Sequence, residues 1–251
     1  MHRLGISIIH DHLDNNTFKS IKSAGFDCVM LSYFANEPIK QIAELILAND
    51  LAISSVHAPL ANINTLWREG TEGDDHLEFL KTRIDFCSEY KVDKMVLHTS
   101  FGDGLPPVSR VGLDRFKDIS DYAKSRNVHI CFENVDEAEH LISVMNEADP
   151  YHGFCWDIGH HKAYFPEYDF NEMFPGRLMY LHIHDNHGTD EHLLPFEGTI
   201  DWNQFAGTLK KLNFTGDITL EPSYRLYKDL PIDEYLHNAY ERASKLRDML
   251  I

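Results

Sequence analysis

Short apolar runs alternate with longer amphipathic stretches from one end of the chain to the other. The apolar runs have the length and β-branched content of buried strands, and Gly, Pro, Asn or Asp residues commonly bound them. Polar residues gather where these runs end, a pattern that bears on function. The expected strands span residues 4–9, 28–33, 51–56, 94–97, 128–132, 153–156, 178–183 and 217–220.

Segments with helical spacing of apolar residues separate the expected strands. Gly25 follows the first of them, where a left-handed residue often ends a helix. Pro38 is expected in the first turn of the second, where its missing N–H does no harm. Asp201 is expected to cap the helix that begins at Trp202. The expected helices span residues 16–24, 37–49, 74–90, 110–126, 137–147, 169–174, 202–212 and 232–250.

Strict alternation of strands and helices predicts parallel strands joined by right-handed crossovers. Eight such units in 251 residues predict an α/β fold of the (β/α)₈ TIM barrel type, which takes about 250 residues. A doubly wound open sheet is the alternative, but no glycine-rich phosphate loop follows the first strand. No low-complexity linker divides the chain, so we expect one domain over residues 1–251.

The charge balance and the cysteines restrict the class of protein. Lys and Arg number 23 against 40 Asp and Glu, a net charge of -17 with no basic run, which disfavours a nucleic acid partner. No stretch is apolar enough to span a membrane, and the N-terminus lacks the features of a signal peptide. We therefore expect a cytoplasmic protein whose cysteines are small buried hydrophobic residues. These cysteines are Cys28, Cys87, Cys131 and Cys155.

The segment after the seventh expected strand is unusually rich in imidazoles and carboxylates. Divalent cations bind neutral imidazole nitrogen and carboxylate oxygen, so this composition indicates a metal site. Strand alternation directs His182 and His184 to one face and Asp185 to the other. Asp190 and His192 share a face if their loop is extended. The plain alternative is a polar surface loop. The residues in question are His182, His184, Asp185, His187, Asp190 and His192.

Similar residues stand at the carboxyl ends of other expected strands. In a barrel these ends converge on one mouth, where catalytic residues lie. Taken singly, each has a structural explanation as a framework histidine, a helix cap or a loop charge. Together, several carboxylates at one mouth would repel one another, and a divalent cation would hold them ionised. The strand-end residues are His57, His98, Glu133, Asp157, His182 and Glu221, with His160 one turn past Asp157.

Motifs in this order make the sequence similar to the xylose-isomerase-like barrel superfamily, which includes the endonuclease IV family. The resemblance covers nearly the whole chain and implies a TIM barrel with a metal site. The motifs are VHAP (56–59), LHTS (97–100), FEN (132–134), WDIGH (156–160), LHIHDN (181–186), DEHLLPFEGTIDW (190–202) and LEP (220–222).

The resemblance implies two metal patterns. In the sugar isomerases and epimerases one divalent ion, here Mn, Co or Zn, would bind Glu133, Asp157, His182 and Glu221. The abundant histidine argues against a purely Mg-type site. In the endonuclease IV-like proteins up to three zinc ions share nine ligands. The additional ligands would then be His57, His98, His160, Asp190 and His192.

The resemblance favours a metal-dependent isomerase or epimerase that acts on a small-molecule sugar or sugar phosphate. Glu133 and Glu221 would be the acid/base pair that moves a proton next to a carbonyl, with a metal-stabilised enediolate. Trp67 is a candidate apolar wall for the sugar and Arg225 a contact for a hydroxyl or phosphate, although packing and surface roles explain both equally well. Histidines that would contact substrate hydroxyls or tune the ligands are His57, His98, His160 and His192.

Other functions stay open. An endonuclease IV-like phosphodiesterase fits the nine ligands, but it fits the acidic charge and the few basic mouth residues less well. A metal-dependent dehydratase or lyase would use the same proton abstraction, and a sugar-binding protein without turnover would use the same fold. The sugar, its phosphorylation and association into a homo-oligomer through outer helices are left open.

Overall fold

Eight parallel strands form a nearly closed barrel in the computed structural model, which describes residues 2–32 and 38–251. The strand order is β7-β6-β5-β4-β3-β2-β1-β8, and a bridge between Ile183 and Leu220 joins the two end strands. The expected (β/α)₈ barrel is therefore confirmed. The strands are β1 (Leu4–Ser7), β2 (Cys28–Ser32), β3 (Ala52–His57), β4 (Lys94–His98), β5 (His129–Glu133), β6 (Gly153–Asp157), β7 (Leu178–His182) and β8 (Ile218–Leu220).

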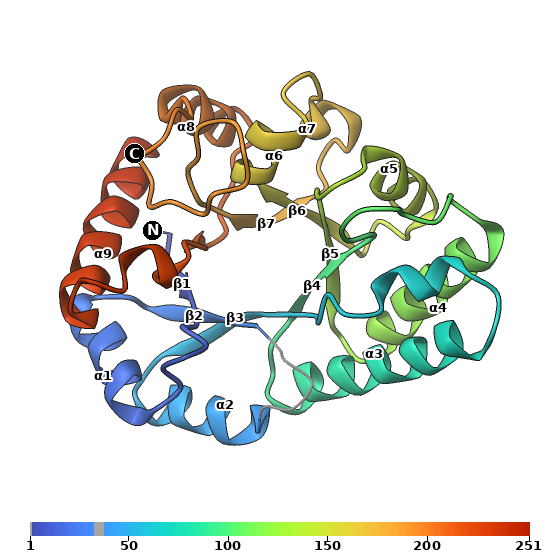
Figure 1. The fold of residues 1–251 in the computed structure, drawn as a ribbon, viewed down its shortest axis with the longest axis horizontal. Coiled ribbons are helices and arrows are strands. Elements are labelled where there is room, and N and C mark those ends of the chain that lie inside the picture. The colour runs from blue at the N-terminus through green and yellow to red at the C-terminus, as the bar shows by residue number, and fades with distance from the viewer. Residues whose placement is uncertain (1, 33–37) are drawn as a thin grey trace.

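The helices form an outer ring in which α9 lies beside α1 and so completes the circle (Figure 1). Within the described residues, no helix is both long and apolar enough to cross a membrane. The helices are α1 (Asn15–Ala24), α2 (Ile39–Ala48), α3 (Thr71–Glu89), α4 (Arg110–Ser125), α5 (Ala138–Glu147), α6 (Ile158–Tyr164), α7 (Phe170–Met173), α8 (Trp202–Lys211) and α9 (Ile232–Met249), with short 3₁₀ helices η1 (Ile63–Trp67) and η2 (Tyr224–Tyr227).

The expected helix boundaries hold where a local signal sets them. Gly25 ends α1 with a left-handed φ of 114°, and Asp201 caps α8 by accepting hydrogen bonds from two backbone N–H groups. Pro38 precedes α2 instead of standing in its first turn. Two expected boundaries, the end of the second strand at Tyr33 and the start of the second helix at Glu37, lie outside the described residues.

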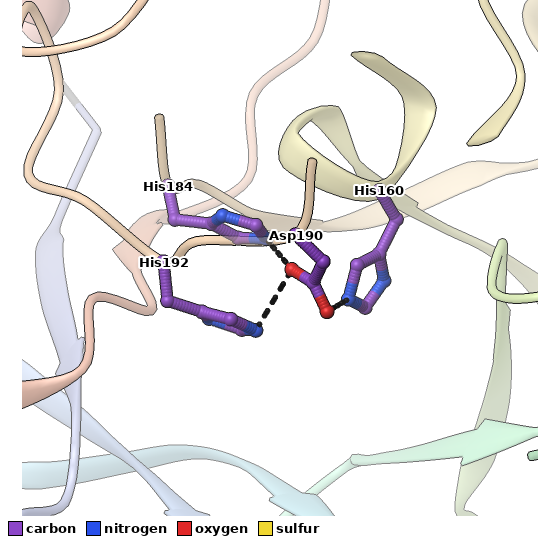
Figure 2. A group of neighbouring side chains, drawn as sticks. All are labelled: His160, His184, Asp190 and His192. Carbon is purple, nitrogen blue, oxygen red and sulfur yellow. Dashed lines mark ion pairs between the residues drawn. The ribbon is translucent and has the colours of Figure 1, made fainter. Parts of the chain in front are cut away.

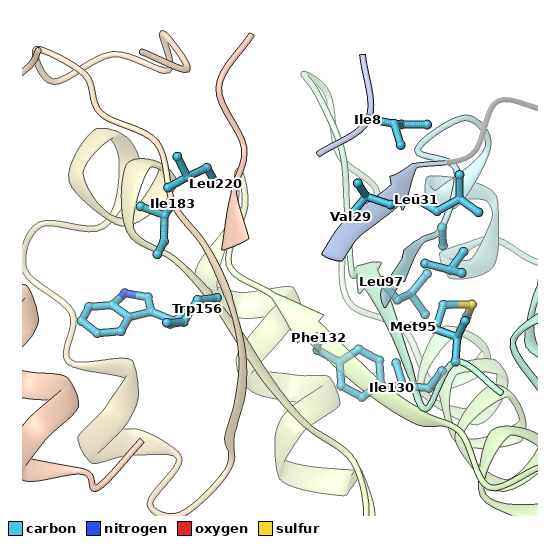
Figure 3. Close-up of a cluster of buried hydrophobic side chains, with 14 of the residues drawn as sticks. Ile8, Val29, Leu31, Met95, Leu97, Ile130, Phe132, Trp156, Ile183 and Leu220 are labelled. Atoms are coloured by element: carbon cyan, nitrogen blue, oxygen red, sulfur yellow. The ribbon is translucent and has the colours of Figure 1, made fainter. Parts of the chain in front are cut away.

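Strand alternation decides which side chains enter the barrel. Val96, Cys131, Cys155 and Tyr180 point inward and form, with Met30, a small interior cluster. Their neighbours in sequence, among them Leu97, Phe132 and Trp156, belong to the larger core beneath the helices (Figure 3). All four cysteines are buried and free, as expected.

The next inward position on each of these strands is polar. Two residues beyond the interior cluster come His98, Glu133, Asp157 and His182, each of them the last residue of its strand. The core of the barrel is thus capped by a layer of imidazoles and carboxylates at its C-terminal mouth, where barrel enzymes carry their active sites.

Candidate active site

The carboxylate of Glu133 is the centre of the mouth. Its side chain is 1% exposed, and its two oxygens face different groups of imidazoles. Oε2 lies 3.2 Å from Nε2 of His57 and 3.1 Å from Nε2 of His98. Oε1 lies 2.9 Å from Nδ1 of His182. Glu133 therefore joins two neighbouring groups of candidate ligands.

The first group, which we call the core group, consists of Glu133, Asp157, His182 and Glu221. One ligand atom from each of these residues lies within 4.8 Å of the others. Nδ1 of His182 is 3.2 Å from Oε2 of Glu221 and 4.0 Å from Oδ2 of Asp157. The structure thus brings together the four residues that the family resemblance implied for a single divalent ion.

Asp157 offers a specific test of whether a cation fits the core group. Its Oδ1 caps α6 by accepting a hydrogen bond from the backbone N–H of His160 at 2.6 Å. Its Oδ2 is buried and has no hydrogen-bond partner among the described residues. A buried carboxylate oxygen without a donor is costly, and a divalent cation would satisfy it. The core group therefore has the donor types and the vacant acceptor that a Mn, Co or Zn ion requires.

The second group consists of His57, His98 and Glu133. The Nδ1 of His57 lies 2.8 Å from the carbonyl oxygen of Ala58. A carbonyl only accepts, so Nδ1 must carry a proton, and a neutral His57 directs the lone pair of Nε2 toward Glu133. Two electron-rich atoms so close together need a proton or a cation between them. This orientation by a backbone carbonyl is typical of metal-binding histidine.

The third group contains His160, His184, Asp190 and His192. His192 Nε2 is 3.3 Å from Oδ1 of Asp190, and His160 Nε2 is 3.6 Å from Oδ2 (Figure 2). The other ring nitrogen of each contacts a backbone carbonyl, that of Glu221 for His192 and that of Asn134 for His160. Both Nε2 atoms thus carry lone pairs when the rings are neutral.

The pKa shifts express the mutual attraction of these groups. Burial by itself raises the pKa of Glu133, but His182 and His98 hold it well below its ordinary value. Burial also raises the pKa of Asp190, yet the hydrogen bond to His160 and its charge lower it to about 2. Burial lowers the pKa of His160, and Asp157, with other carboxylates, raises it well above its ordinary value. The carboxylates of Glu133 and Asp190 are therefore ionised. The imidazole nitrogens around them can each carry a proton or bind a metal ion.

A pocket of about 340 Å³ opens above these groups at the barrel mouth. Glu133, Glu221 and Asp190 contribute to its floor, and Phe101 and Tyr164 contribute apolar surface to its wall. Its described lining contains no Lys or Arg. A pocket of this size suits one small molecule.

Two expected substrate contacts lie elsewhere. Trp67 is 2% exposed at the end of η1, where its indole N–H donates to the carbonyl of Thr99 at 2.6 Å. Gly112 of α4 makes room for the ring, because a Cβ there would overlap it. Trp67 is thus a core residue and not a wall of the pocket. Arg225 has an 82% exposed side chain, lies 3.9 Å from Asp11 and is not part of the described pocket lining.

The structure also gives roles to three residues that belonged to neither of the two implied ligand sets. His184 joins the third group, on the same side of the chain as His182, as alternation predicted for the pair. Asp185 points away and accepts a hydrogen bond from the indole N–H of Trp202 at 3.1 Å. Asn134 holds the backbone of Asp157 through both its amide atoms. Its position directly after Glu133 in the FEN motif was the only signal for this role.

Comparison with known proteins identifies the family of the chain. A family described as xylose isomerase-like TIM barrel matches residues 18–245. The chain belongs to this family. An uncharacterized protein of Sinorhizobium fredii, y4fM, is 28% identical over 194 residues, which make up 69% of this chain and 61% of that protein. The chain thus spans less than two thirds of that relative.

Solved structures share the fold of this family member. The crystal structure of a D-tagatose 3-epimerase-like protein aligns with a TM-score of 0.76 at 22% identity, covering 99% of this chain and 97% of that chain. The structure of an L-ribulose 3-epimerase aligns with a TM-score of 0.77 at 17% identity, covering 99% of this chain and 96% of that chain. At these identities the likeness establishes the common barrel.

Proposed function

We propose that the protein is a metal-dependent isomerase or epimerase of a small carbohydrate. The observation that carries this proposal is the core group of Glu133, Asp157, His182 and Glu221 beneath a pocket of about 340 Å³. Two structural neighbours, a D-tagatose 3-epimerase-like protein and an L-ribulose 3-epimerase, support the same proposal. A Mn, Co or Zn ion held by the core group would polarise the oxygen atoms of a bound sugar and acidify the adjacent C–H.

The two glutamates have unequal access to the pocket. The Glu221 side chain is 17% exposed, whereas that of Glu133 is 1% exposed. Either carboxylate, acting as base, takes the proton from the carbon next to the carbonyl. The C–H electron pair then forms a C=C bond and leaves charge on the carbonyl oxygen. The other glutamate, after it has taken up a proton from solvent, returns that proton to the opposite face and so inverts the carbon. Return of the proton to the former carbonyl carbon, together with transfer of the neighbouring hydroxyl proton to the former carbonyl oxygen, isomerises the sugar.

The histidines around Glu133 keep it ionised and fixed. His57 and His98 contact one of its oxygens, and His182 contacts the other. A carboxylate held from both sides loses little entropy when a substrate binds, so its position relative to the reacting carbon is preset. The apolar wall of the pocket would exclude water from the carbon that exchanges its proton.

Phosphodiester hydrolysis is the second candidate, and one observation favours it. Glu133 directs one oxygen to each of two ligand groups, and the third group lies beside them, so all nine ligands of a three-zinc site are assembled. The net charge of -17 and a described pocket lining without Lys or Arg suit an anionic backbone less well. We therefore place carbohydrate chemistry first.

Deuterium exchange tests the choice. The protein loaded with Mn, Co or Zn is incubated in D₂O with a panel of ketoses and aldoses, free and phosphorylated, and deuterium on carbon is followed by NMR. The proposal predicts incorporation next to the carbonyl of at least one sugar, with formation of its epimer or isomer. An abasic-site DNA duplex is assayed in parallel. Cleavage of that duplex without exchange in any sugar would overturn the proposal and support the hydrolase.

A further inference from the structure

Phe101 stands at the edge of the pocket, and hydrogen bonds from two different segments hold its backbone. The side-chain amide of Asn64, in η1, donates from Nδ2 to the carbonyl oxygen of Phe101 at 2.7 Å. Oδ1 of the same amide accepts from the backbone N–H of Phe101 at 3.0 Å. The next backbone N–H, that of Gly102, donates to Oδ2 of Asp136 at 2.8 Å. Two consecutive residues are therefore fixed by side chains from η1 and from the segment after β5.

The segment that carries Asn64 is itself anchored to the helices around the barrel. The side chain of Arg115, on α4, is buried and donates to the carbonyl oxygen of Leu66 at 3.0 Å. It also pairs with Asp74 of α3 at 2.7 Å. Asn64 therefore reaches Phe101 from a 3₁₀ helix whose own position is fixed.

The backbone that follows Phe101 does not define the position of the ring by itself. Gly102 and Gly104 both have left-handed φ angles, 79° and 67°, and glycine is the most permissive residue for the backbone. Surface connections of this kind are usually among the more mobile parts of a fold. The contacts of Asn64 and Asp136 are therefore what sets the place of the ring.

The ring of Phe101 lines the pocket beside the candidate ligands. Its centroid lies 6.2 Å from that of His98, and Phe101 is 45% exposed. Leu60 and Val135 line the same pocket, whose described lining contains no Lys or Arg. Such a wall suits the C–H surface of a sugar and not a charged group. Asn64 is not part of the described lining, so any effect it has on a substrate passes through Phe101.

We propose that Asn64 is a positioning residue that presets the Phe101 ring as the surface on which the uncharged C–H face of the sugar lies. The inference rests on the proposed function, because it concerns how that substrate is oriented. A ring already held in place costs little entropy to order when the sugar binds. Phe101 shares the pocket with Glu133 and Glu221, so a sugar lying on the ring is restricted in which carbon it presents to them.

Steady-state kinetics of Asn64→Ala, alone and combined with Phe101→Ala, test the proposal. D-tagatose and L-ribulose, followed by the rest of the deuterium-exchange panel, are the sugars used. We expect Asn64→Ala to raise KM roughly 3- to 10-fold with little change in kcat, because the loosened ring must be ordered on binding. In the Phe101→Ala protein the same substitution should change KM by less than about twofold, since the ring through which Asn64 acts is gone.

Thr65→Val is the matched control. Thr65 follows Asn64 in η1, and its Oγ1 donates to the carbonyl oxygen of Asn62 at 2.7 Å. Loss of this bond should lower stability and leave KM unchanged. An equal rise in KM for Asn64→Ala in the presence and absence of the Phe101 ring would overturn the proposal. A loss of stability without a change in KM would do the same, because Asn64 would then be purely structural.

NMR on the unsubstituted protein tests the proposal even if Asn64→Ala does not fold. With the exchanging sugar bound, we expect nuclear Overhauser effects between its C–H protons and the Phe101 ring protons, assigned with Phe101→Tyr. The backbone N–H groups of Phe101 and Gly102 should exchange with solvent more slowly than that of Asp103. Sugar contacts with other wall residues alone would contradict the proposal.

The outcomes separate this inference from the proposed function. Absence of deuterium exchange in every sugar would overturn both. Exchange in a sugar whose KM is the same for the native protein and Asn64→Ala would overturn the role of Asn64 alone.

Discussion

Glu133 and His182 face each other at 2.9 Å, and neither side chain is accessible to solvent beyond 1%. In the unfolded chain both would be hydrated, so their burial together requires that the charges be matched. The pairing keeps the pKa of Glu133 low and so preserves an ionised carboxylate beneath the pocket.

The acid/base role of the two glutamates predicts a large loss of turnover when either becomes an amide. Glu133→Gln and Glu221→Gln should each reduce kcat by about 10²–10⁴, because an amide cannot accept the proton. Deuterium incorporation into the substrate is the direct measurement. Glu191→Gln, a change in the same mouth segment outside the proposed machinery, should keep normal exchange. Retained exchange in both core variants would remove the glutamates from the mechanism.

Trp67 should affect stability and not substrate binding. Trp67→Phe removes the N–H that satisfies the carbonyl of Thr99, which we expect to cost about 1–3 kcal/mol in the free energy of unfolding. Urea unfolding measures this loss, and KM should stay unchanged. Phe101→Ala is the matched comparison, because Phe101 lines the pocket and is 45% exposed. Phe101→Ala should raise KM at nearly constant stability. A higher KM for Trp67→Phe, with lost stability only in Phe101→Ala, would contradict the placement of Trp67 in the core and of Phe101 in the pocket.

His152 predicts a pH dependence of stability. Its Nδ1 accepts a hydrogen bond from the backbone N–H of Ile130 at 3.0 Å, and burial lowers the pKa of His152 from 6.5 to about 4. The unfolded chain takes up this proton below about pH 6.5, but the folded protein resists it down to about 4. The neutral His152 therefore makes its full contribution to the free energy of unfolding above about pH 6.5. This contribution is lost as the pH falls toward 4.

Comparing the native protein with His152→Asn over this pH range isolates that contribution. The asparagine oxygen can still accept from Ile130 but does not titrate. We expect the stability advantage of the native protein to shrink by up to about 3 kcal/mol between pH 6.5 and 4, since one pKa unit is about 1.4 kcal/mol. Urea unfolding at several pH values measures the difference. Curves that stay parallel would exclude His152 as a titrating group.

The sequence predicted the strand–helix alternation well because the periodicity of apolar residues is a local signal. The strand ends also marked the members of the core group as residues of the mouth, since the mouth of a barrel collects them. Their grouping around one ion was implied by the family resemblance. The helix α6 was missed because Asp157 both ends β6 and caps α6, leaving no loop between them. A short WDIGH segment that contains a glycine has little helical character of its own.

Side chains whose role depends on distant contacts could not be assigned from the sequence. Trp67 stands in a polar loop, and its burial depends on Gly112, a residue of α4. His184 was visible as a partner of His182 on one strand face, but its place in the third group depends on how the loop brings Asp190 and His192 back to it. Such tertiary juxtapositions have no local pattern that marks them.

We propose that the core group binds a divalent cation at the floor of the pocket. Anomalous diffraction from crystals grown with Mn tests this most directly. We expect a peak coordinated by Glu133, Asp157, His182 and Glu221, at bond lengths of about 2.0–2.2 Å for oxygen and nitrogen ligands. Crystals soaked in Mn, Co and Zn that show no peak among these four residues would contradict it.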